Sequence, residues 1–302
     1  MKEPILYACL VCCLLGCDQS NPATKQSQSK AGAETTTAQT SEQVPDTEPA
    51  QATTSTKLKI IAWNIESGGN DPNVIAQELK ALNAADVYCL NEVHPDNFQV
   101  YEKALGKTFD AVHSDSGFDD RLQILYSNQK FKLLESKEMH SLNDGRHRAP
   151  LYVRLQEKAS QTEVVVVTNH LARGNAKYRK EQASGLREWA REMSATTALV
   201  CIGDMNMDYT FATDKGNDAL PEILRDNIWK WCKPAELIDT NWDDRDGDGK
   251  DNYPGSMLDL AFVAGPAKTW NPVCRVIKRD GDFPDDRKRS DHRPIELVLS
   301  KQ

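Results

Sequence analysis

Residues 163–206 read EVVVVTNHLARGNAKYRKEQASGLREWAREMSATTALVCIGDMN and alternate between two kinds of hydrophobic pattern. The runs EVVVVTNHL (163–171) and ALVCIGDMN (198–206) are short and apolar up to their polar ends, as is typical of buried strands. Between them, residues 175–194 repeat apolar side chains at helical spacing, with one stripe formed by Leu186, Trp189 and Met193. The stretch therefore predicts a strand, a long amphipathic helix and a second strand.

The same alternation of strands and helices extends outward from this stretch in both directions. Two further helices are predicted, at 73–82 behind an Asn-Asp-Pro cap and at 218–232. Further strands are predicted at 58–65, 87–93, 122–127, 132–139, 149–156, 258–265 and 294–300. Because strands outnumber helices and several strands are consecutive, we expect an α+β fold. It would be a four-layer sandwich of two packed sheets flanked by helices, in one domain spanning 57–302.

The N-terminus differs from the rest of the chain. Residues 1–17 (MKEPILYACLVCCLLGC) contain one early Lys and then an apolar run that is too short to span a bilayer and is typical of a signal peptide. Their end, Leu-Leu-Gly-Cys, resembles a bacterial lipobox, in which the signal is cut before the cysteine and that cysteine, here Cys17, is lipidated. We expect an exported lipoprotein anchored to a membrane of the bacterial cell envelope. A plain secretory signal, which would give a secreted or periplasmic protein, is the alternative.

Residues 18–56 contain no aromatic residue, no Leu and no Ile, and they are rich in Ser, Thr, Gln, Ala and Pro. Such a segment buries too little apolar surface to offset its chain entropy, so we expect a disordered polar linker. The whole chain is 39% hydrophobic and 27% charged, as expected for a soluble protein with a core. Its formal net charge of −8 at pH 7 argues against a dedicated DNA-coating protein, which carries a strongly basic face.

The cysteines of the predicted domain fall into two groups. Cys89 and Cys201 stand inside apolar runs, where a free thiol behaves as a small hydrophobic side chain. Cys232 and Cys274 stand in more polar surroundings. In an oxidising compartment these two are candidates for a disulfide, and free thiols are the alternative.

Polar residues repeatedly stand where an apolar strand ends or begins. They are Asn64, Glu92, Asn169, His170, Asp204, Asn206, Asp259, Ser290, Asp291 and His292. A single such residue is more often a cap or a satisfied core group, but six strand ends with carboxylate, amide or imidazole side chains indicate a shared pocket. Since Asp, Glu and Asn oxygens suit Mg²⁺ or Mn²⁺ better than zinc, the sequence predicts a hard divalent cation there.

Six short motifs occur in a fixed order: WNI (63–65), NEV (91–93), TNHL (168–171), GDMN (203–206), LDL (258–260) and SDHRP (290–294). Together they resemble the endonuclease/exonuclease/phosphatase superfamily, and the resemblance covers residues 57–300. That superfamily includes deoxyribonucleases, abasic-site endonucleases, sphingomyelinases and inositol-polyphosphate phosphatases. The resemblance implies a deoxyribonuclease-like sandwich of two mixed sheets. It also implies hydrolysis of a phosphoester through a metal-bound phosphate and an activated water.

The resemblance further implies roles for individual residues. Glu92 matches the principal metal carboxylate of the family, Asn64 a neighbouring metal or phosphate contact, and Asp291 a metal-side carboxylate. Asp204 and Asn206 match the pair that orients the attacking water and the phosphate.

Two imidazoles also match the family pattern. His292 matches a catalytic imidazole that is held by Asp259, and whether His292 or Asp204 takes the proton from the water stays open. His170 matches the second imidazole of the deoxyribonuclease and sphingomyelinase branches, which abasic-site endonucleases lack, and Asp120 is a candidate partner for it. Arg148 matches a basic phosphate contact of the deoxyribonucleases.

A further acidic motif lies outside these matches. Residues 244–249 read D-x-D-x-D-G, the opening of a calcium loop, with carboxylates at Asp244, Asp246 and Asp248. Gly255 stands at the twelfth position, where a calcium loop has a bidentate Glu. A Ca²⁺ site and a solvated acidic loop are therefore both consistent with the sequence.

The substrate is the least determined feature. Basic residues gather at 146–148, 173–180 and 287–289, where they either follow a nucleic-acid backbone or form solvated surface. We see no long aromatic hairpin suited to a membrane, which we would want for a sphingomyelinase. We therefore predict a monomeric, exported, metal-dependent nuclease that acts on nucleic acid. A lipid or small-molecule phosphodiesterase or phosphatase of the same superfamily is the alternative, and a binding module without activity is disfavoured because the expected catalytic positions are filled.

Overall fold

The computed structural model describes residues 56–82 and 85–301. The predicted signal peptide, with Cys17, and all but the last residue of the predicted linker (18–56) lie outside the described residues. Within the described ranges, no helix is both long enough and apolar enough to cross a membrane.

The described residues form two six-stranded sheets. The first, in the order β11-β12-β1-β2-β4-β3, contains β1 (Thr56–Asn64), β2 (Val87–Val93), β3 (Phe109–His113), β4 (Arg121–Ser127), β11 (Val273–Val276) and β12 (Ile295–Lys301). The second, in the order β5-β6-β7-β8-β10-β9, contains β5 (Phe131–Glu138), β6 (Leu151–Glu157), β7 (Glu163–His170), β8 (Ala198–Thr210), β9 (Lys230–Trp231) and β10 (Ser256–Ala264). Each sheet is mixed: β1 and β2 pair in parallel, as do β7 and β8, whereas their other neighbours are antiparallel.

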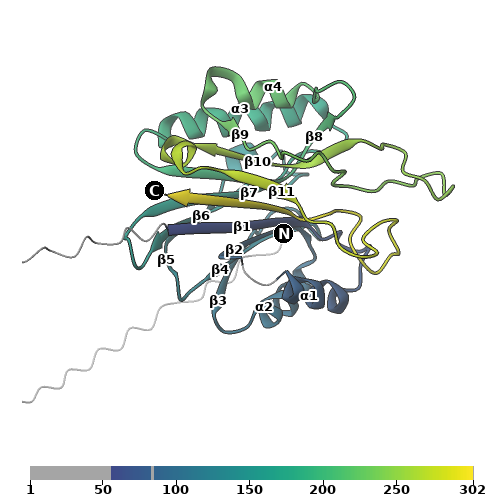
Figure 1. Cartoon of the computed structure of the whole chain (residues 1–302), viewed down its shortest axis with the longest axis horizontal. Helices are drawn as coiled ribbons and strands as arrows, with labels where there is room; N and C mark the ends of the chain where they lie inside the picture. Colours follow the sequence, from purple (N-terminus) through teal and green to yellow (C-terminus); the bar gives the residue numbers. More distant parts are fainter. Residues whose placement is uncertain (1–55, 83–84, 302) are drawn as a thin grey trace, which may run out of the picture. The chain divides into compact units, whose positions relative to one another are not determined.

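Helices cover the outer face of each sheet (Figure 1). The first sheet carries α1 (Pro72–Ala81) and α2 (Phe98–Leu105), and the second carries α3 (Ala176–Met193) and α4 (Ala219–Leu224). Short 3-10 helices occupy Pro95–Asn97, His140–Leu142, Arg225–Asn227 and Gly265–Thr269. The predicted α+β sandwich of two mixed sheets flanked by helices is confirmed.

The alternation of side chains along β1 shows how the layers pack. Ile60 and Ala62 belong to the core that is continuous with the second sheet, whereas Ile61 and Trp63 pack with residues of α1 and α2. All four side chains are at most 1% exposed. A strand that is buried on both faces needs a continuous apolar run. This explains why residues 60–63 of β1 are all apolar and the polar Asn64 comes only at the end of the strand.

Three parts of the fold differ from the sequence prediction. The helix predicted at 218–232 ends at Leu224, because Asp226 and Asn227 adopt left-handed backbone angles with φ of 62° and 53°. The chain then enters β9 beside β10. Patterning also does not predict α2, β3 or β11.

The cysteines in the described residues are all free and buried: Cys89, Cys201, Cys232 and Cys274. The disulfide considered between Cys232 and Cys274 is therefore not formed in this structure. All four thiols instead belong to the apolar core, and burial raises the pKa of Cys232 to about 12.

Candidate functional site

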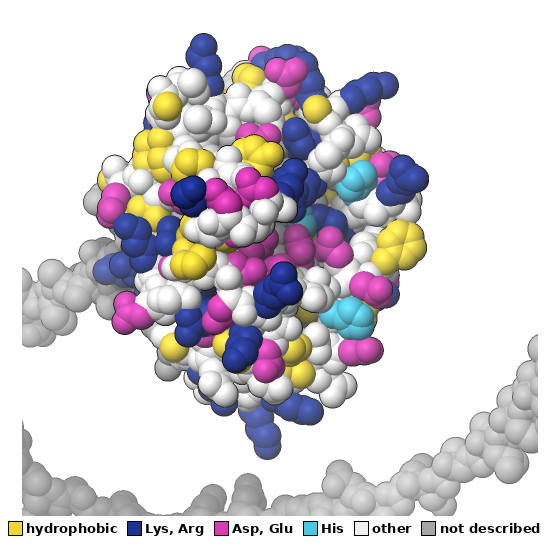
Figure 2. Space-filling model, turned by 90° about the vertical axis from the view of Figure 1, so that its right-hand side faces the viewer, with side chains coloured by type: hydrophobic (Ala, Val, Ile, Leu, Met, Phe, Trp, Pro, Cys, Tyr) yellow, Lys and Arg dark blue, Asp and Glu magenta, His cyan; other side chains and the backbone are white. Residues whose placement is uncertain are grey.

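The carboxyl ends of β1, β2 and β7 meet at one edge of the sandwich. On this face, acidic side chains gather in a hollow that Lys and Arg side chains surround (Figure 2). Strand register brings three of the predicted residues side by side, because Asp204 on β8 lies opposite His170 on β7 and also opposite Asp259 on β10. The predicted convergence of these strand ends is therefore present in the fold.

His292 is held on both sides. Its Nδ1 lies 2.8 Å from Oδ2 of Asp259, and the indole of Trp63 donates a hydrogen bond of 2.9 Å to its carbonyl oxygen. Its Nε2 faces the centre of the cluster, 3.9 Å from Oδ2 of Asp204 and 3.8 Å from Oδ1 of Asp291. Burial alone would lower the pKa of His292, but the carboxylates of Asp259 and Asp291 outweigh it and raise that pKa well above its usual value.

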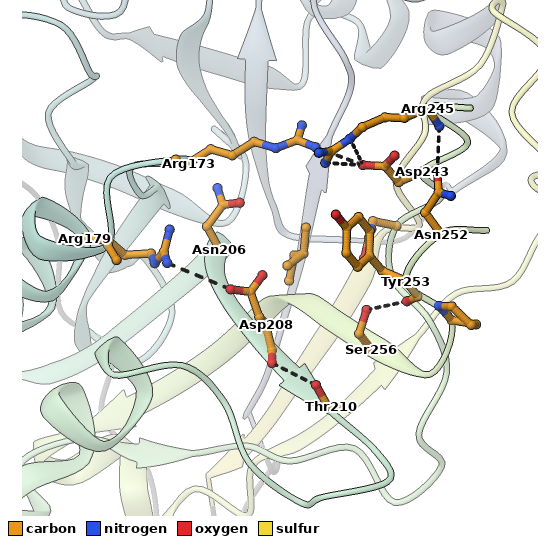
Figure 3. A pocket seen from close by; sticks show the side chains of 15 residues that line it. Arg173, Arg179, Asn206, Asp208, Thr210, Asp243, Arg245, Asn252, Tyr253 and Ser256 are labelled. Atoms are coloured by element: carbon orange, nitrogen blue, oxygen red, sulfur yellow. Dashed lines mark hydrogen bonds and ion pairs between the residues drawn. The ribbon is translucent and has the colours of Figure 1, made fainter. Parts of the chain in front are cut away.

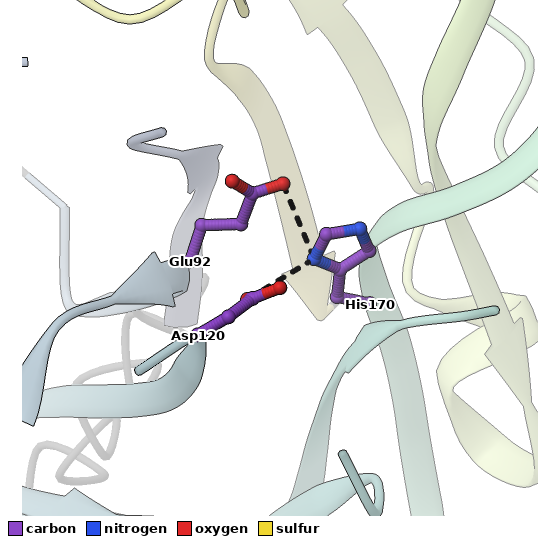
Figure 4. A group of neighbouring side chains, drawn as sticks. All are labelled: Glu92, Asp120 and His170. Carbon is purple, nitrogen blue, oxygen red and sulfur yellow. Dashed lines mark ion pairs between the residues drawn. The ribbon is translucent and has the colours of Figure 1, made fainter. Parts of the chain in front are cut away.

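His170 lies between the two sheets (Figure 4). Its Nδ1 is 3.6 Å from Oε1 of Glu92 and 3.6 Å from Oδ1 of Asp120, while its Nε2 is 3.3 Å from Oδ2 of Asp204. Arg148 supports this arrangement, because Nη1 pairs with Asp120 and Nε donates a hydrogen bond of 3.2 Å to the carbonyl oxygen of His170. The structure thus places Asp120 beside His170, as the sequence suggested, and adds Glu92, Asp204 and Arg148 to the same group.

Asp204 connects the two imidazoles. Burial opposes its ionisation, but the charges of His170 and His292 outweigh burial, and the pKa of Asp204 lies below its usual value. The backbone N–H of Asn206 donates to Oδ1 of Asp204 over 2.9 Å. Asn64 donates through Nδ2 to both Asp204 (3.1 Å) and Glu92 (2.9 Å).

Asn91 is a site residue that the sequence prediction missed. Its Nδ2 donates to Oγ1 of Thr168 over 3.0 Å, and its Oδ1 accepts the backbone N–H of Asp204 over 2.9 Å, so it joins the two sheets. Gly203 makes this approach possible, since a Cβ there would lie 2.3 Å from the carbonyl oxygen of Asn169 and 2.7 Å from Oδ1 of Asn91. The sequence did offer a signal for Asn91, because it directly precedes Glu92 in the NEV motif.

Glu66 is the second residue that the sequence prediction missed. Its carboxylate accepts the backbone N–H of Asp291 over 3.0 Å. Burial, together with repulsion from Asp291, Asp285 and Glu92, raises the pKa of Glu66 to about 8. Burial and the charges of Glu92, Asp204 and Asp285 likewise raise the pKa of Asp291 to about 6. The crowding of like charges is thus strongest on the Asp291 side of the cluster.

Backbone strain coincides with this cluster. Glu66, Glu92 and Asn206 have left-handed φ angles of 55°, 54° and 48°. The pairing of β2 with β4 shifts register between Leu90 and Val93, and Glu92 lies within this irregular stretch. Non-glycine residues held in this region gather at functional sites, where the surrounding structure imposes the conformation.

The residues present fit a hard divalent cation. One ligand atom each from Glu92, Asp120 and His170 lies within 4.8 Å of the other two. Among the described residues, Asp120 Oδ1 and His170 Nδ1 are buried without a hydrogen-bond partner, and a cation or its hydration shell would supply one. The ligand set expected from the sequence was Glu92, Asn64 and Asp291. It shares Glu92 with this group, but Asn64 directs an N–H donor at Glu92 and gives its oxygen to the backbone of Glu66.

The predicted calcium loop is separate from this cluster. Asp244, Asp246 and Asp248 each offer an oxygen within 4.8 Å of the others. In the structure these carboxylates accept backbone N–H groups of the loop, with Gly249 donating to Asp244 over 3.1 Å and Lys250 donating to Asp248 over 2.9 Å. Loop turns of this kind are common without a metal.

Comparison with known proteins gives one family. A sequence model of the Endonuclease/Exonuclease/phosphatase family matches residues 61–292. No curated protein sequence matches the chain. Among solved structures, D. rerio TDP2 complexed with a single-strand DNA product is 18% identical, with a TM-score of 0.62, covering 82% of this chain and all of the other (100%).

Two further solved structures share the fold. The mannosyl-6-phosphatase of Bacteroides thetaiotaomicron is 16% identical, with a TM-score of 0.60, covering 80% of this chain and 99% of that one. The human Nocturnin catalytic domain with bound sulfate is also 16% identical, with a TM-score of 0.59, covering 81% of this chain and 95% of that one.

A sandwich whose strand ends join two imidazoles to a cluster of carboxylates defines an enzyme that hydrolyses phosphoric esters. The chain belongs to the Endonuclease/Exonuclease/phosphatase family, whose members are generally metal-dependent.

Proposed function

We propose that the chain is a divalent-cation-dependent phosphodiesterase that cleaves nucleic acid at the cluster around Asp204. The observation that carries the proposal is the continuous row Asp259, His292, Asp204 and His170, with contacts of 2.8, 3.9 and 3.3 Å. Two imidazoles on either side of one carboxylate can exchange protons with water and with a leaving oxygen. This supports ester hydrolysis by an activated water, without a covalent intermediate on the protein.

Each part of the cluster has a role in this proposal. Glu92 would hold Mg²⁺ or Mn²⁺ together with Asp291 or with Asp120 and His170, while Nδ2 of Asn64 orients the Glu92 carboxylate. The cation would neutralise charge on the phosphate. His292, oriented by Asp259, and Asp204 would position the attacking water, and whichever of the two is unprotonated would accept its proton. A phosphodiester resists attack because it is anionic, so charge neutralisation and positioning supply most of the rate.

The phosphate itself would contact Arg148 and Asn206. Two guanidinium nitrogens of Arg148 are engaged by Asp120 and by the carbonyl of His170, while Nη2 has no hydrogen-bond partner among the described residues. Asn206 donates through Nδ2 to the carbonyl oxygen of Leu171 over 3.0 Å, which fixes the plane of its amide. Both residues are at most 8% exposed, so substrate would meet them in fixed positions.

A second candidate is a phosphatase for small phosphorylated molecules or a lipid phosphodiesterase. A cavity of about 710 Å³ beside the cluster has the size of a small-molecule site. The mannosyl-6-phosphatase that shares the fold acts on such a molecule, by its name. A nuclease is preferred because basic residues gather around the acidic hollow, where they can follow a nucleic-acid backbone.

A substrate panel separates the two candidates. The purified full chain is incubated with plasmid DNA, a single-stranded oligonucleotide, RNA, sphingomyelin, an inositol phosphate and mannose 6-phosphate, with Mg²⁺, with Mn²⁺ and with EDTA. We expect cleavage of at least one nucleic acid that EDTA abolishes. Hydrolysis confined to the lipid or to the phosphomonoesters would contradict the nuclease proposal and support the second candidate.

We further propose that Cys17 is lipidated and that the enzyme works at a membrane of the cell envelope as a monomer. The supporting observation is the sequence Leu-Leu-Gly-Cys at the end of an apolar run. Wild type should partition with membranes, and Cys17→Ser should release it. Recovery of the wild type in the soluble exported fraction would favour a plain secretory signal instead. Ca²⁺ binding by the 244–249 loop stays a prediction, tested by calorimetric titration of wild type and Asp246→Asn.

A further inference from the structure

The cavity of about 710 Å³ opens directly beside the catalytic cluster. Three residues that line the cavity also contact or adjoin residues of that cluster. The backbone N–H of Asn206 donates to Asp204, Asn241 forms a β-bridge with His292, and Leu258 directly precedes Asp259 in the sequence. A substrate bound at the cluster therefore extends into this cavity or passes its mouth.

The cavity is lined by three arginines, in contrast to the acidic cluster next to it. Arg173 and Arg245 stand at its mouth with side chains 60% and 62% exposed (Figure 3). Both guanidinium groups meet one oxygen of Asp243, at 3.2 and 2.6 Å, and Asp243 is itself 9% exposed. One largely buried carboxylate thus holds two cations together, and Nη1 of each arginine has no hydrogen-bond partner among the described residues.

Arg179 lies deeper and lacks a full set of partners. Its residue is 8% exposed, Nη1 donates to the carbonyl oxygen of Ala172 over 2.8 Å, and Nη2 is 3.9 Å from Asp208. Its Nε is buried and, among the described residues, has no hydrogen-bond partner. A buried unpartnered N–H on a cationic side chain indicates that an anionic acceptor belongs nearby.

The amino end of α3 adds to this positive region. Gly174 and Ala176 line the cavity, and α3 runs for 18 residues from there. The first N–H groups of a helix carry a partial positive charge and favour anions. Asp208 and Asp243 are the acids in the lining, so three arginines and a helix terminus face two carboxylates.

Tyr253 supplies a different kind of contact at the same mouth. Tyr253 is 52% exposed, which is unusual for a large aromatic residue. The guanidinium of Arg245 lies 5.4 Å from the ring centroid. An exposed ring backed by a guanidinium is a surface on which a nucleobase stacks.

We propose that this cavity is a nucleotide subsite, in which Arg173, Arg179 and Arg245 bind the phosphate adjoining the scissile one while Tyr253 stacks on the base. The inference rests on the proposed nuclease function and adds to it a preference for substrates that carry a second phosphate. It also explains how a chain of net charge −8 holds a polyanion, because the cation-binding cluster and the arginine-lined cavity divide the two phosphates between them.

The first test measures binding without catalysis. Thymidine 3′,5′-bisphosphate is titrated calorimetrically into the full chain in EDTA, where the acidic cluster repels phosphate. Arg173→Ala and Arg245→Ala should each weaken Kd about tenfold, as for one lost charge-assisted hydrogen bond, and Tyr253→Leu about tenfold for lost stacking. Arg275→Ala is the matched control, because Arg275 is 67% exposed and ion-paired at 2.7 Å but lies on β11. An unchanged Kd in both cavity arginine variants overturns the subsite.

The second test measures cleavage of thymidine dinucleotides with no terminal phosphate, a 5′-phosphate or a 3′-phosphate. Wild type should cleave one of the phosphorylated dinucleotides with a kcat/KM about tenfold above that of the unphosphorylated one. The cavity arginine variants should lose this preference through a higher KM.

Fructose 1,6-bisphosphate is the binding control, because it has two phosphates and no base. If it binds as tightly as the nucleotide, the assignment of the subsite to nucleotides is overturned. If no dinucleotide is cleaved but nucleotide binding still depends on the arginines, the nuclease proposal is refuted and the subsite stands. Cleavage that ignores the arginines would refute only the subsite.

Discussion

Asp259 and His292 form a buried pair in which Oδ2 of the carboxylate lies 2.8 Å from Nδ1 of the ring, although 33 positions separate them in the chain. Asp259 is fully buried, and its backbone N–H donates to Oγ1 of Thr240 over 3.2 Å. Since the hydrogen bond at Nδ1 fixes the tautomer of the ring, Nε2 is the nitrogen directed at Asp204. The pair therefore sets which nitrogen can exchange a proton with a bound water.

Replacing either member of this pair should reduce the rate without unfolding the protein. We expect His292→Ala to lower kcat by about 10²- to 10⁴-fold, the usual contribution of a general acid or base. Asp259→Asn should produce much of the same loss, because it frees the orientation and tautomer of the ring. Steady-state kinetics on one DNA substrate, with thermal unfolding as the control, measures both. A wild-type rate in His292→Ala would remove this residue from the mechanism.

His170 offers a test of which branch of the family the site resembles. Its ring contacts Asp204, Glu92 and Asp120, so His170→Ala should lower the rate by a factor of about 10² or more. A mild effect of His170→Ala together with a severe effect of Asp204→Asn would instead indicate the abasic-site endonuclease pattern. The pH–rate profiles of the two variants, measured on the same DNA substrate, decide between these outcomes.

The close approach of the sheets at Gly203 should be intolerant of any side chain. Gly203 has a φ of 135°, and an added Cβ would lie 2.3 Å from a backbone oxygen, so Gly203→Ala should destabilise the fold by about 3 kcal/mol or more. Gly247→Ala is the control, since φ is 72° there and nothing lies within 4 Å; it should cost about 1 kcal/mol. Chemical denaturation measures both, and equal effects would show that the approach at Gly203 is not tight.

Acid stability should depend on Glu222 between α3 and α4. Its carboxylate pairs with Arg187, and the two side chains are 6% and 7% exposed. Burial opposes ionisation of Glu222, but Arg187 and Arg225 outweigh it and hold its pKa below its usual value. Because the pKa of Glu222 is lower in the folded than in the unfolded chain, its ionised carboxylate stabilises the fold at pH values above the unfolded-state pKa. This contribution is lost as the pH falls through the folded-state pKa.

Glu222→Gln should therefore be less stable than wild type at pH 7 by about 3 kcal/mol, because Arg187 loses its buried partner. The difference should shrink as the pH falls below about 4, where the wild-type carboxyl also becomes neutral. Denaturation curves at several pH values give the comparison. A difference that stays constant down to pH 2 would contradict this account of the pair.

Much of the fold followed from patterning because buried strands and amphipathic helices carry distinct periodicities. α3 and β8 were predictable for this reason, and so was the polar residue at each strand end. The helix beyond Leu224 was not, since Asp226 and Asn227 tolerate left-handed angles that helical spacing does not reveal. Edge strand β11 has only four residues, too few for alternation to stand out.

The candidate site was predictable where a residue carries a charge at a strand end, and unpredictable where its role depends on tertiary contacts. Glu92, Asp204 and His292 were found by the first criterion. Asn91 was missed because an amide inside a strand becomes informative only when a second sheet approaches it, here at Thr168. Glu66 was missed because its partner, the backbone of Asp291, is 225 positions away.

The most direct test of the central claim is the metal-activation curve of DNA cleavage for wild type and Glu92→Gln. Glu92 contacts Asn64 and His170, and its replacement keeps the shape of the side chain while removing the charge that would hold the cation. We predict that EDTA abolishes wild-type cleavage. We also predict that Glu92→Gln needs a much higher Mg²⁺ concentration or remains inactive, with unchanged thermal unfolding in EDTA. Equal turnover of the two proteins at limiting Mg²⁺ would contradict the account.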